Sequence, residues 1–239
     1  MGKKLLTLST ADDPTAHLAD SFSYSPFTAR NIIRHGAVSI DKQAPAHEAV
    51  SLMLEEHVSG LPVSDTGLLA GILTEKDLLR TLLETSYLPG IAADYMSRDV
   101  ISFDMEDELS NISSNLVVSP FRCVPILLEH KIAGTISRID LIRFYRQRTQ
   151  GDRNDTSRTS PSKTQVEDAM TLGLVTVLPD ARLEQAMDLI VKHHITGLPV
   201  VDREMILLGI ITEKDLLRSI CVSKYTDCLV EDLMTREVL

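Results

Sequence analysis

Apolar side chains recur along this chain with the period of an α-helix in two matching places. The first set is Ala46, Ala49, Val50, Met53 and Leu54, and the second is Leu183, Ala186, Met187, Ile190 and Val191. Apolar residues at i, i+3, i+4, i+7 and i+8 form one stripe along a helix. Each stretch is therefore predicted to be a helix that buries one face.

Short apolar runs around these helices predict strands. A short strand is expected at residues 37–40, and another begins at residues 60–63. The sequence Ser-Asp-Thr-Gly at residues 64–67 predicts a turn, which leads into a buried strand at residues 68–73. A second helix is expected to follow, from Thr74 through Leu83. The predicted unit is β-α-β-β-α.

One ten-residue phrase shows that this unit is repeated. The sequence of residues 71–80, GILTEKDLLR, recurs at residues 209–218 with a single change at Ile211, and a looser copy stands at residues 134–141. Gly71 and Gly134 are 63 residues apart, as are Pro62 and Pro125, so the first two copies run in register. Such repeats are single supersecondary units that bury their apolar faces against one another.

The repeats and a polar stretch between them predict the domain organisation. The expected parts are a tail at 1–28, a pair of units at 29–145 (29–86 and 91–145), a linker at 146–163, a third unit at 164–221 and the start of a fourth unit at 228–239. The linker is predicted because residues 147–163 are polar and lack apolar periodicity. The fourth unit is predicted because Asp232-Leu233-Met234-Thr235-Arg236 matches the segment that opens the second unit.

The third unit has no complete partner in the sequence. Its predicted apolar sheet face consists of Val175, Val177, Val200, Leu208 and Ile210. Two explanations are open: the chain is a fragment that lacks the rest of the fourth unit, or another molecule covers this face. Because large exposed apolar faces usually mark interfaces, the chain is expected to form a homodimer through this unit.

Composition narrows the range of partners and locations. With 24 Lys and Arg against 34 Asp and Glu, the net charge of −10 disfavours nucleic-acid binding, which depends on phosphate neutralisation. No apolar run approaches the ~18 residues of a membrane span, so no membrane insertion and a cytoplasmic location are expected. The cysteines, Cys123, Cys221 and Cys228, form no metal or redox motif, and their odd number argues against a disulfide framework.

The combined pattern resembles the cystathionine-β-synthase (CBS) domain family. The resemblance rests on Gly-Leu-Pro-Val before the turn, followed by Gly-apolar-apolar-Thr-x-x-Asp-Leu-Leu, in the same order in three copies. It implies an α/β (α+β) fold of repeated β-α-β-β-α CBS units that work in tandem pairs. It also implies a regulatory protein that binds an adenosine nucleotide such as AMP, ADP or ATP in clefts between paired units.

The resemblance also implies which residues bind the nucleotide. Asp77, Asp140 and Asp215 would bind ribose hydroxyls. Thr74, Ser137 and Thr212 would face the ribose and phosphate, and Lys76, Arg138 and Lys214 would supply local positive charge. The segments Val58-Ser59-Gly60 and Ile195-Thr196-Gly197 would contact adenine, and Ser39, Ser102 and Thr176 would line the same cleft. In the middle copy Phe121-Arg122-Cys123 departs from the pattern, and its bulk could fill one adenine slot or supply a phosphate contact.

The Thr-x-x-Asp motif has a second interpretation. It is also a helix capping box, in which the hydroxyl and the carboxylate satisfy backbone amides at a helix start. The two roles can coexist. His57 and His194, at matching helix ends, are expected to have structural roles rather than to bind metal.

No catalytic motif accompanies these residues. The sequence has no Gly-x-Ser-x-Gly, P-loop or Gly-x-Gly-x-x-Gly motif. It therefore predicts a non-enzymatic sensor of an adenosine nucleotide that controls a partner. The alternative is a ligand-free CBS scaffold that dimerises or docks onto an enzyme or transporter. An enzyme that uses the nucleotide as its substrate is less well supported, because no general base or metal cluster accompanies the Asp residues.

Overall fold

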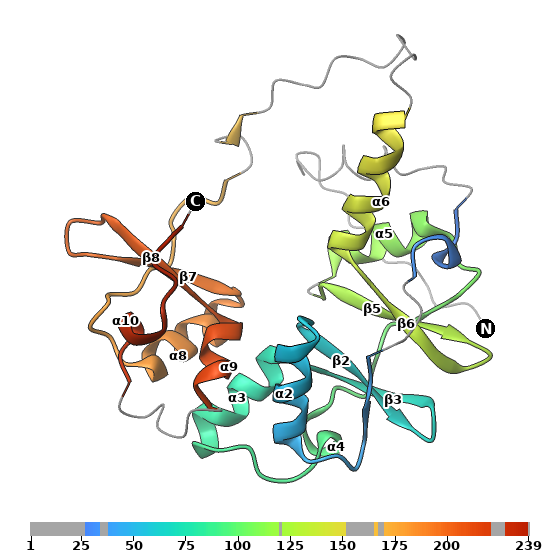
Figure 1. The fold of residues 1–239 in the computed structure, drawn as a ribbon, viewed down its shortest axis with the longest axis horizontal. Helices are drawn as coiled ribbons and strands as arrows, with labels where there is room; N and C mark the ends of the chain where they lie inside the picture. Colours follow the sequence, from blue (N-terminus) through green and yellow to red (C-terminus); the bar gives the residue numbers. More distant parts are fainter. Residues whose placement is uncertain are drawn as a thin grey trace, which may run out of the picture. The chain divides into compact units, whose positions relative to one another are not determined.

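The fold is given by a computed structural model, which describes residues 27–33, 38–119, 121–151, 165–166, 170–220 and 228–238 (Figure 1). The chain divides into two compact units. One unit holds the second repeat together with the residues that precede the first repeat, and the other holds the first and third repeats. Most of the predicted N-terminal tail and most of the predicted linker lie outside the described residues.

The first repeat has the predicted β-α-β-β-α order. Its elements are β1 (Ile40–Asp41), α2 (Ala46–Glu55), β2 (Gly60–Asp65), β3 (Leu68–Thr74), α3 (Glu75–Thr85) and α4 (Ala92–Tyr95). β1 is parallel to β2, with Ile40 opposite Val63, and β2 is antiparallel to β3. The apolar stripe of α2 is buried as predicted, apart from Leu54, which is half-buried. Val38 and Ser39 were predicted to lie in the first strand, but β1 begins after them, at Ile40.

The third repeat follows the same plan. Its elements are α8 (Leu183–His193), β7 (Gly197–Val201), β8 (Leu207–Thr212), α9 (Glu213–Ile220) and α10 (Val230–Leu233). Val177 forms a parallel bridge to Val200, and both side chains are buried in the core. The predicted open face was therefore wrong for these two residues. Val200 lies opposite Gly209, so its side chain and that of Ile210 point to opposite faces of the hairpin.

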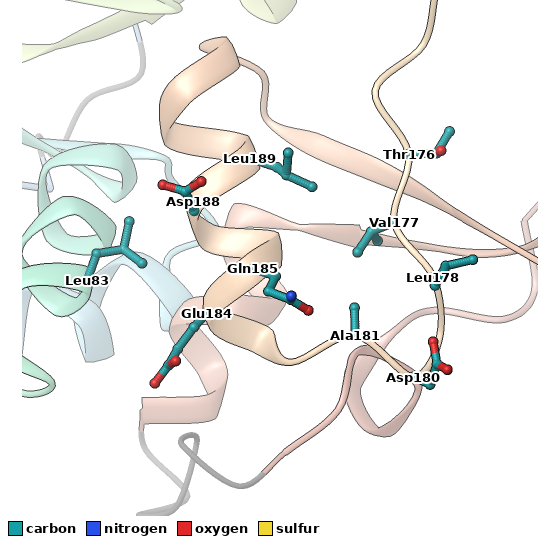
Figure 2. A pocket seen from close by; sticks show the side chains of 10 residues that line it. All are labelled: Leu83, Thr176, Val177, Leu178, Asp180, Ala181, Glu184, Gln185, Asp188 and Leu189. Carbon is teal, nitrogen blue, oxygen red and sulfur yellow. The ribbon is translucent and has the colours of Figure 1, made fainter.

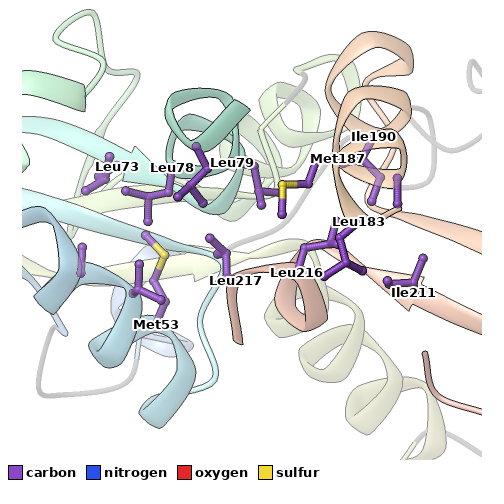
Figure 3. Packing of buried hydrophobic residues seen from close by; sticks show 14 of the residues in the cluster. Met53, Leu73, Leu78, Leu79, Leu183, Met187, Ile190, Ile211, Leu216 and Leu217 are labelled. Carbon is purple, nitrogen blue, oxygen red and sulfur yellow. The ribbon is translucent and has the colours of Figure 1, made fainter. Parts of the chain in front are cut away.

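The first and third repeats share one apolar core, which is formed where their helices meet. Helices α2 and α3 pack against α8 and α9. Figure 3 shows Leu78 and Leu79 from α3 beside Leu216 and Leu217 from α9, and all four are fully buried. Burying a leucine completely contributes roughly 1.5–3 kcal/mol. The third repeat therefore does have a partner within the chain, on its helical side.

The second repeat forms the core of the other compact unit. Its elements are η1 (Ala29–Asn31), β4 (Phe103–Asp104), α5 (Leu109–Val118), β5 (Cys123–Leu128), β6 (Lys131–Ser137) and α6 (Arg138–Gly151). The largest buried side chains, including Leu109, Ile112, Ile126 and Ile136, form its core. Helix α6 continues to Gly151, so the predicted linker begins inside a helix.

A short docking segment packs against each repeat. The docking segments are residues 28–33 on the second repeat, 91–96 on the first and 229–234 on the third. Ala29, Ala92 and Val230 hold the same position in them, and their N–H groups donate to the carbonyls of Asp107, Ala44 and Ala181 over 2.9, 2.8 and 2.9 Å. The residues predicted to open a fourth unit therefore complete the third.

The recurrent glycine of the repeated phrase lies under these docking segments. A Cβ at Gly71 would lie 2.6 Å from Met96 Sδ, and one at Gly209 would lie 2.6 Å from the Thr235 carbonyl. Backbone hydrogen bonds join Ile72 to Ser97 and Ile210 to Thr235 in both directions. Close backbone approach thus explains glycine at this position.

Candidate functional site

The Thr-x-x-Asp motif of the first repeat forms a compact polar group where β3 ends and α3 begins. The Thr74 hydroxyl donates to Oδ2 of Asp77 over 2.5 Å, and the Thr74 N–H donates to the same oxygen over 2.9 Å. The Asp77 N–H lies 3.4 Å from the Thr74 hydroxyl oxygen, which accepts from it. This is a capping box, with Thr74 as the N-cap.

The same geometry recurs in the other two repeats. Ser137 donates to Asp140 Oδ2 over 2.5 Å from its hydroxyl and 3.0 Å from its N–H. For Thr212 and Asp215 the corresponding distances are 2.6 and 3.0 Å. The capping interpretation is therefore confirmed in all three repeats. Within the described part of the chain, Oδ1 of Asp77 and Oδ1 of Asp215 have no hydrogen-bond partner, so capping leaves an acceptor oxygen on each carboxylate.

The loop before the central strand lies directly beside this helix start. The Ser59 carbonyl accepts from the Glu75 N–H over 3.1 Å, and the Thr196 carbonyl accepts from the Glu213 N–H over 3.1 Å. Gly60 stands opposite Thr74 in the sheet, and Gly197 opposite Thr212. Val58 and Ile195 are half-buried against the shared core. The structure thus brings together the predicted loop, hydroxyl and carboxylate residues of the first and third repeats.

The predicted first-strand residues lie farther from the motif. Ser39 precedes β1, and β2 separates β1 from β3, whose end carries Thr74. Thr176 precedes Val177, which bridges to β7, and Ser102 precedes β4, which pairs with β5. Each of these three residues therefore lies directly before the short strand or bridge that pairs with the central strand of its repeat.

The three predicted cationic residues have different environments. Lys214 Nζ lies 2.8 Å from His57 Nδ1. Arg138 donates to the carbonyls of Leu116 and Ser119 over 2.9 and 2.7 Å, which caps the end of α5. Lys76 is half-buried and makes no hydrogen bond or ion pair to any described residue.

The capping role of Arg138 was not predicted from the sequence, although aligning the repeats shows that Arg138 does not correspond to the two lysines. Arg138 stands where the other repeats have Glu75 and Glu213, and Ile139 stands where they have lysine. An arginine in the first helical position, in place of a glutamate, is poorly placed to share the role of Lys76.

The second repeat also differs at the glycine position. Cys123 replaces the glycine and lies near the start of α6. Burial raises the pKa of the Cys123 thiol, the positive charge of Arg122 partly opposes this, and the charge of Asp140 adds to it. The thiol is therefore kept neutral, beside the carboxylate that was expected to bind ribose.

A cavity of about 770 Å³ lies elsewhere on the third repeat (Figure 2). It is lined by Leu83, Thr176, Val177, Leu178, Asp180, Ala181, Glu184, Gln185, Asp188 and Leu189. Of the predicted site residues only Thr176 lines this cavity. The carboxylates of Asp180, Glu184 and Asp188 in the cavity lining disfavour an anionic ligand. We therefore place the candidate site at the capping motif and not in this cavity.

The described residues contain neither a clustered metal site nor a helix that could span a membrane. Among them, no group of three His, Cys, Asp or Glu side chains is arranged to hold a metal ion. None of the helices in the described ranges combines the length and the apolar character needed to cross a membrane.

The sequence and fold are similar to those of known proteins. The profile of the CBS domain matches residues 29–84, 92–147 and 166–221. Protein MJ1225 of Methanocaldococcus jannaschii is 28% identical over 191 residues, which cover 79% of this chain and 68% of that protein. Its crystal structure superposes with a TM-score of 0.74 and 19% identity, covering 89% of this chain and 84% of that one. This likeness shows the shared fold.

A local match to an enzyme is much shorter. Inosine-5'-monophosphate dehydrogenase of Aquifex aeolicus is 44% identical over 73 residues. Those residues make up 30% of this chain but only 14% of the enzyme. The match therefore carries no information about the rest of that enzyme or its activity.

Proposed function

This chain belongs to the CBS domain family, and we propose that it is a non-catalytic cytoplasmic regulator that binds an adenosine nucleotide, AMP, ADP or ATP, beside α3 of the first repeat. The observation that carries the proposal is the state of Asp77. Its carboxylate is fixed through Oδ2 by Thr74, while Oδ1 has no partner among the described residues.

The surrounding groups suit the parts of a nucleotide. A carboxylate oxygen accepts hydrogen bonds from the vicinal hydroxyls of ribose, and such charge-assisted bonds are the stronger ones. The Lys76 ammonium and the positive end of the α3 dipole favour a phosphate nearby. Gly60, which has no side chain, and the half-buried Val58 would offer a partly apolar surface to the base.

The first repeat is the preferred site because each of the other two repeats lacks at least one of these features. In the second repeat Cys123 replaces the glycine, Ile139 replaces the lysine, and Arg138 is used as a helix cap. In the third repeat Lys214 is bonded to His57. Only the first repeat combines the glycine, the fixed carboxylate and a lysine without a partner in the described ranges.

The proposed mechanism is a shift between conformations of the chain. A ligand that binds one arrangement of the repeats more tightly increases its population and changes the surface offered to a partner. The partner would be a regulated enzyme or transporter, and the chain would act as a homodimer. MJ1225, whose structure is described as that of a proposed archaeal homologue of g-AMPK, and the dehydrogenase with a matching segment are consistent with a regulatory role.

Calorimetry on matched variants tests the proposal. AMP, ADP and ATP would be titrated into the wild type, Asp77→Ala and Asp140→Ala. Asp77→Ala should lower nucleotide affinity by roughly 10-fold or more, because charge-assisted hydrogen bonds contribute about 1.5–3 kcal/mol. Asp140→Ala removes an equivalent cap, so both variants should lose about 1 kcal/mol of folding stability in urea.

The control separates binding from capping. If Asp77→Ala and Asp140→Ala lose the same stability and neither changes affinity, the motif is only a cap. A wild type that binds none of the nucleotides supports the ligand-free scaffold instead, and conversion of a bound nucleotide to product would show an enzyme.

A further inference from the structure

The cavity beside α8, which we call the acidic groove, differs in chemistry from the proposed nucleotide site (Figure 2). It has a volume of about 770 Å³, and five of its ten lining residues are apolar: Leu83, Val177, Leu178, Ala181 and Leu189. Its charged lining residues are all acidic: Asp180, Glu184 and Asp188. Apolar walls combined with carboxylates suit a cationic ligand that also has apolar parts.

The carboxylates of the acidic groove have no partner among the described residues. Glu184 and Asp188 stand one turn apart on α8, and like charges at i and i+4 destabilise a helix. Within the described part of the chain, neither these two side chains nor that of Asp180 forms an ion pair or a hydrogen bond. Figure 2 shows both α8 carboxylates on the side of the helix that faces Leu83. A cation bound beside them would therefore relieve their repulsion.

Aligning the repeats shows that the two α8 carboxylates are particular to the third repeat. Glu184 and Asp188 stand where the first repeat has His47 and Ser51 on α2, and the second repeat has serine at both positions. All three repeats form this helix and bury its apolar stripe, so the fold does not require carboxylates here. Their presence in one repeat indicates a role outside folding.

Leu178 differs from the other repeats in the opposite direction. It is 38% exposed, and the first and second repeats have Asp41 and Asp104 at this position. The third repeat thus places an apolar side chain in solvent where both other repeats have a carboxylate. The loss of charge at Leu178, together with the gain of charge on α8, gives the acidic groove separate apolar and acidic parts.

We infer that the acidic groove docks a basic segment of a partner protein, in which arginine or lysine residues alternate with apolar ones. A second cavity of about 320 Å³ adjoins the groove, because Leu178 and Asp180 line both. Its lining adds three carboxylates and one cation, those of Asp202, Glu204, Glu231 and Arg203. Two adjoining cavities with a net acidic lining suit an extended chain better than a compact ligand.

The acidic groove offers complementary contacts to both kinds of side chain in such a segment. The aliphatic stem of an arginine or lysine would pack on the half-buried Leu83 and Leu189, while its charged end reaches a carboxylate. An apolar side chain next to it would cover Leu178. The inference does not depend on nucleotide binding, because none of these residues belongs to the capping motif.

Fluorescence anisotropy tests the inference with a labelled peptide of alternating arginine and leucine, mixed with roughly 0.1–100 µM of the full chain in the absence of nucleotide. Glu184→Gln combined with Asp188→Asn removes two charges from the groove and should weaken binding by about 10-fold or more. The matched control is Asp99→Asn combined with Glu129→Gln, at two exposed carboxylates elsewhere, which makes the same change in net charge. At physiological ionic strength distant charges are screened, so the control should stay within about 2-fold of the wild type.

Leu178→Asp separates docking in the groove from general charge attraction. Because the variant adds a negative charge, attraction alone would make the peptide bind more tightly. Loss of the apolar contact should instead weaken binding by about 5-fold or more. Both other repeats have aspartate at this position, so the variant should keep the wild-type melting curve.

Each outcome decides the question. A wild type that does not bind the peptide overturns the inference, as does an equal loss of affinity in the groove variant and its control, or tighter binding by Leu178→Asp. Spermidine is the competitor, and if it displaces the labelled peptide as effectively as the unlabelled peptide does, the groove binds a small polyamine and not a protein segment. If Leu178→Asp fails to fold, the charge variants still decide.

Discussion

Lys214 in the first turn of α9 donates a hydrogen bond to Nδ1 of His57, which follows α2, over 2.8 Å. The bond joins the third repeat to the first at the edge of their shared core. His57 has a left-handed backbone conformation, with φ of 56°, and His194 has φ of 54° as the C-cap of α8. Both histidines thus stand at helix ends, as predicted, and Lys214 takes part in repeat packing rather than being open to a phosphate.

The bond between Lys214 and His57 should contribute little to stability. It is exposed, so Lys214→Met and His57→Ala should each lower the free energy of unfolding by less than about 1 kcal/mol in urea melts. Leu217→Ala, in the buried contact beside it, should cost about 2–5 kcal/mol. A larger loss for Lys214→Met than for Leu217→Ala would show that polar contacts hold the repeats together.

Lys214→Met and Lys76→Met should differ in their effect on nucleotide affinity. Lys214→Met should leave the affinity for AMP or ATP unchanged, because Lys214 already has a partner, whereas Lys76→Met should lower it. Calorimetry measures both affinities. An equal loss in the two variants would move the proposed site away from the first repeat alone.

The loss of stability on replacing the methionine of the entry sequence should depend on whether that methionine is packed. Met96 is 9% exposed and lies over Gly71, whereas Met170 occupies the corresponding sequence position and is 52% exposed. Met96→Ser should destabilise the chain by about 2–5 kcal/mol in urea, as large-to-small changes in a core do. Met170→Ser should stay within about 0.5 kcal/mol of the wild type. Equal effects would mean that Met170 is buried in solution.

Removing one buried hydroxyl from the core of the second repeat should raise the stability of the chain. Ser113 Oγ is buried on α5 and has no hydrogen-bond partner among the described residues, while the first repeat has Val50 at this position. An unsatisfied buried polar group costs about 1–3 kcal/mol, so Ser113→Ala should raise the free energy of unfolding by about 1 kcal/mol. Ser114→Ala, next to it on the exposed side, is the control and should change little. A destabilised Ser113→Ala would indicate a partner for the hydroxyl, such as a buried water.

The elements of each repeat could be predicted because their signals are local. The stripe from Ala46 to Met53 has the helical period, and Thr74 with Asp77 forms the cap that the spacing suggests. The turn before Leu68 contains Thr66 and Gly67, both with positive φ, in the predicted stretch. These features depend only on residues close together in sequence.

The pairing of elements could not be predicted in the same way. An apolar stripe predicts that one face of a helix is buried, but it does not indicate which element covers that face. The sequence therefore contains no indication that the first repeat packs on the third. Ala29 was assigned to the first unit because it precedes it, yet its side chain is buried in the core of the second repeat. The role of Arg138 was missed for a related reason, since its partners are carbonyls, which every residue has.

The thiol of Cys123 should make stability depend on pH in the alkaline range. Its burial raises its pKa, with Arg122 acting against the shift and Asp140 adding to it. A raised pKa in the folded state means that the folded chain keeps a proton that the unfolded chain loses. The stabilisation is therefore complete below the ordinary thiol pKa of about 8.5 and is lost as the pH rises through the folded-state value.

Urea melts of the wild type and Cys123→Ala between about pH 7 and pH 10 measure this contribution. The wild type should lose more stability than Cys123→Ala over the upper half of the range, because only the wild type has a thiol that ionises more readily in the unfolded chain than in the folded one. Desolvation also raises the pKa of Tyr95, with a smaller effect from Asp94, and the Tyr95 hydroxyl donates to the Pro89 carbonyl. Both proteins should therefore be compared in a Tyr95→Phe background, which removes that second titration. Parallel curves in this background would show that the Cys123 thiol reaches solvent in the folded chain.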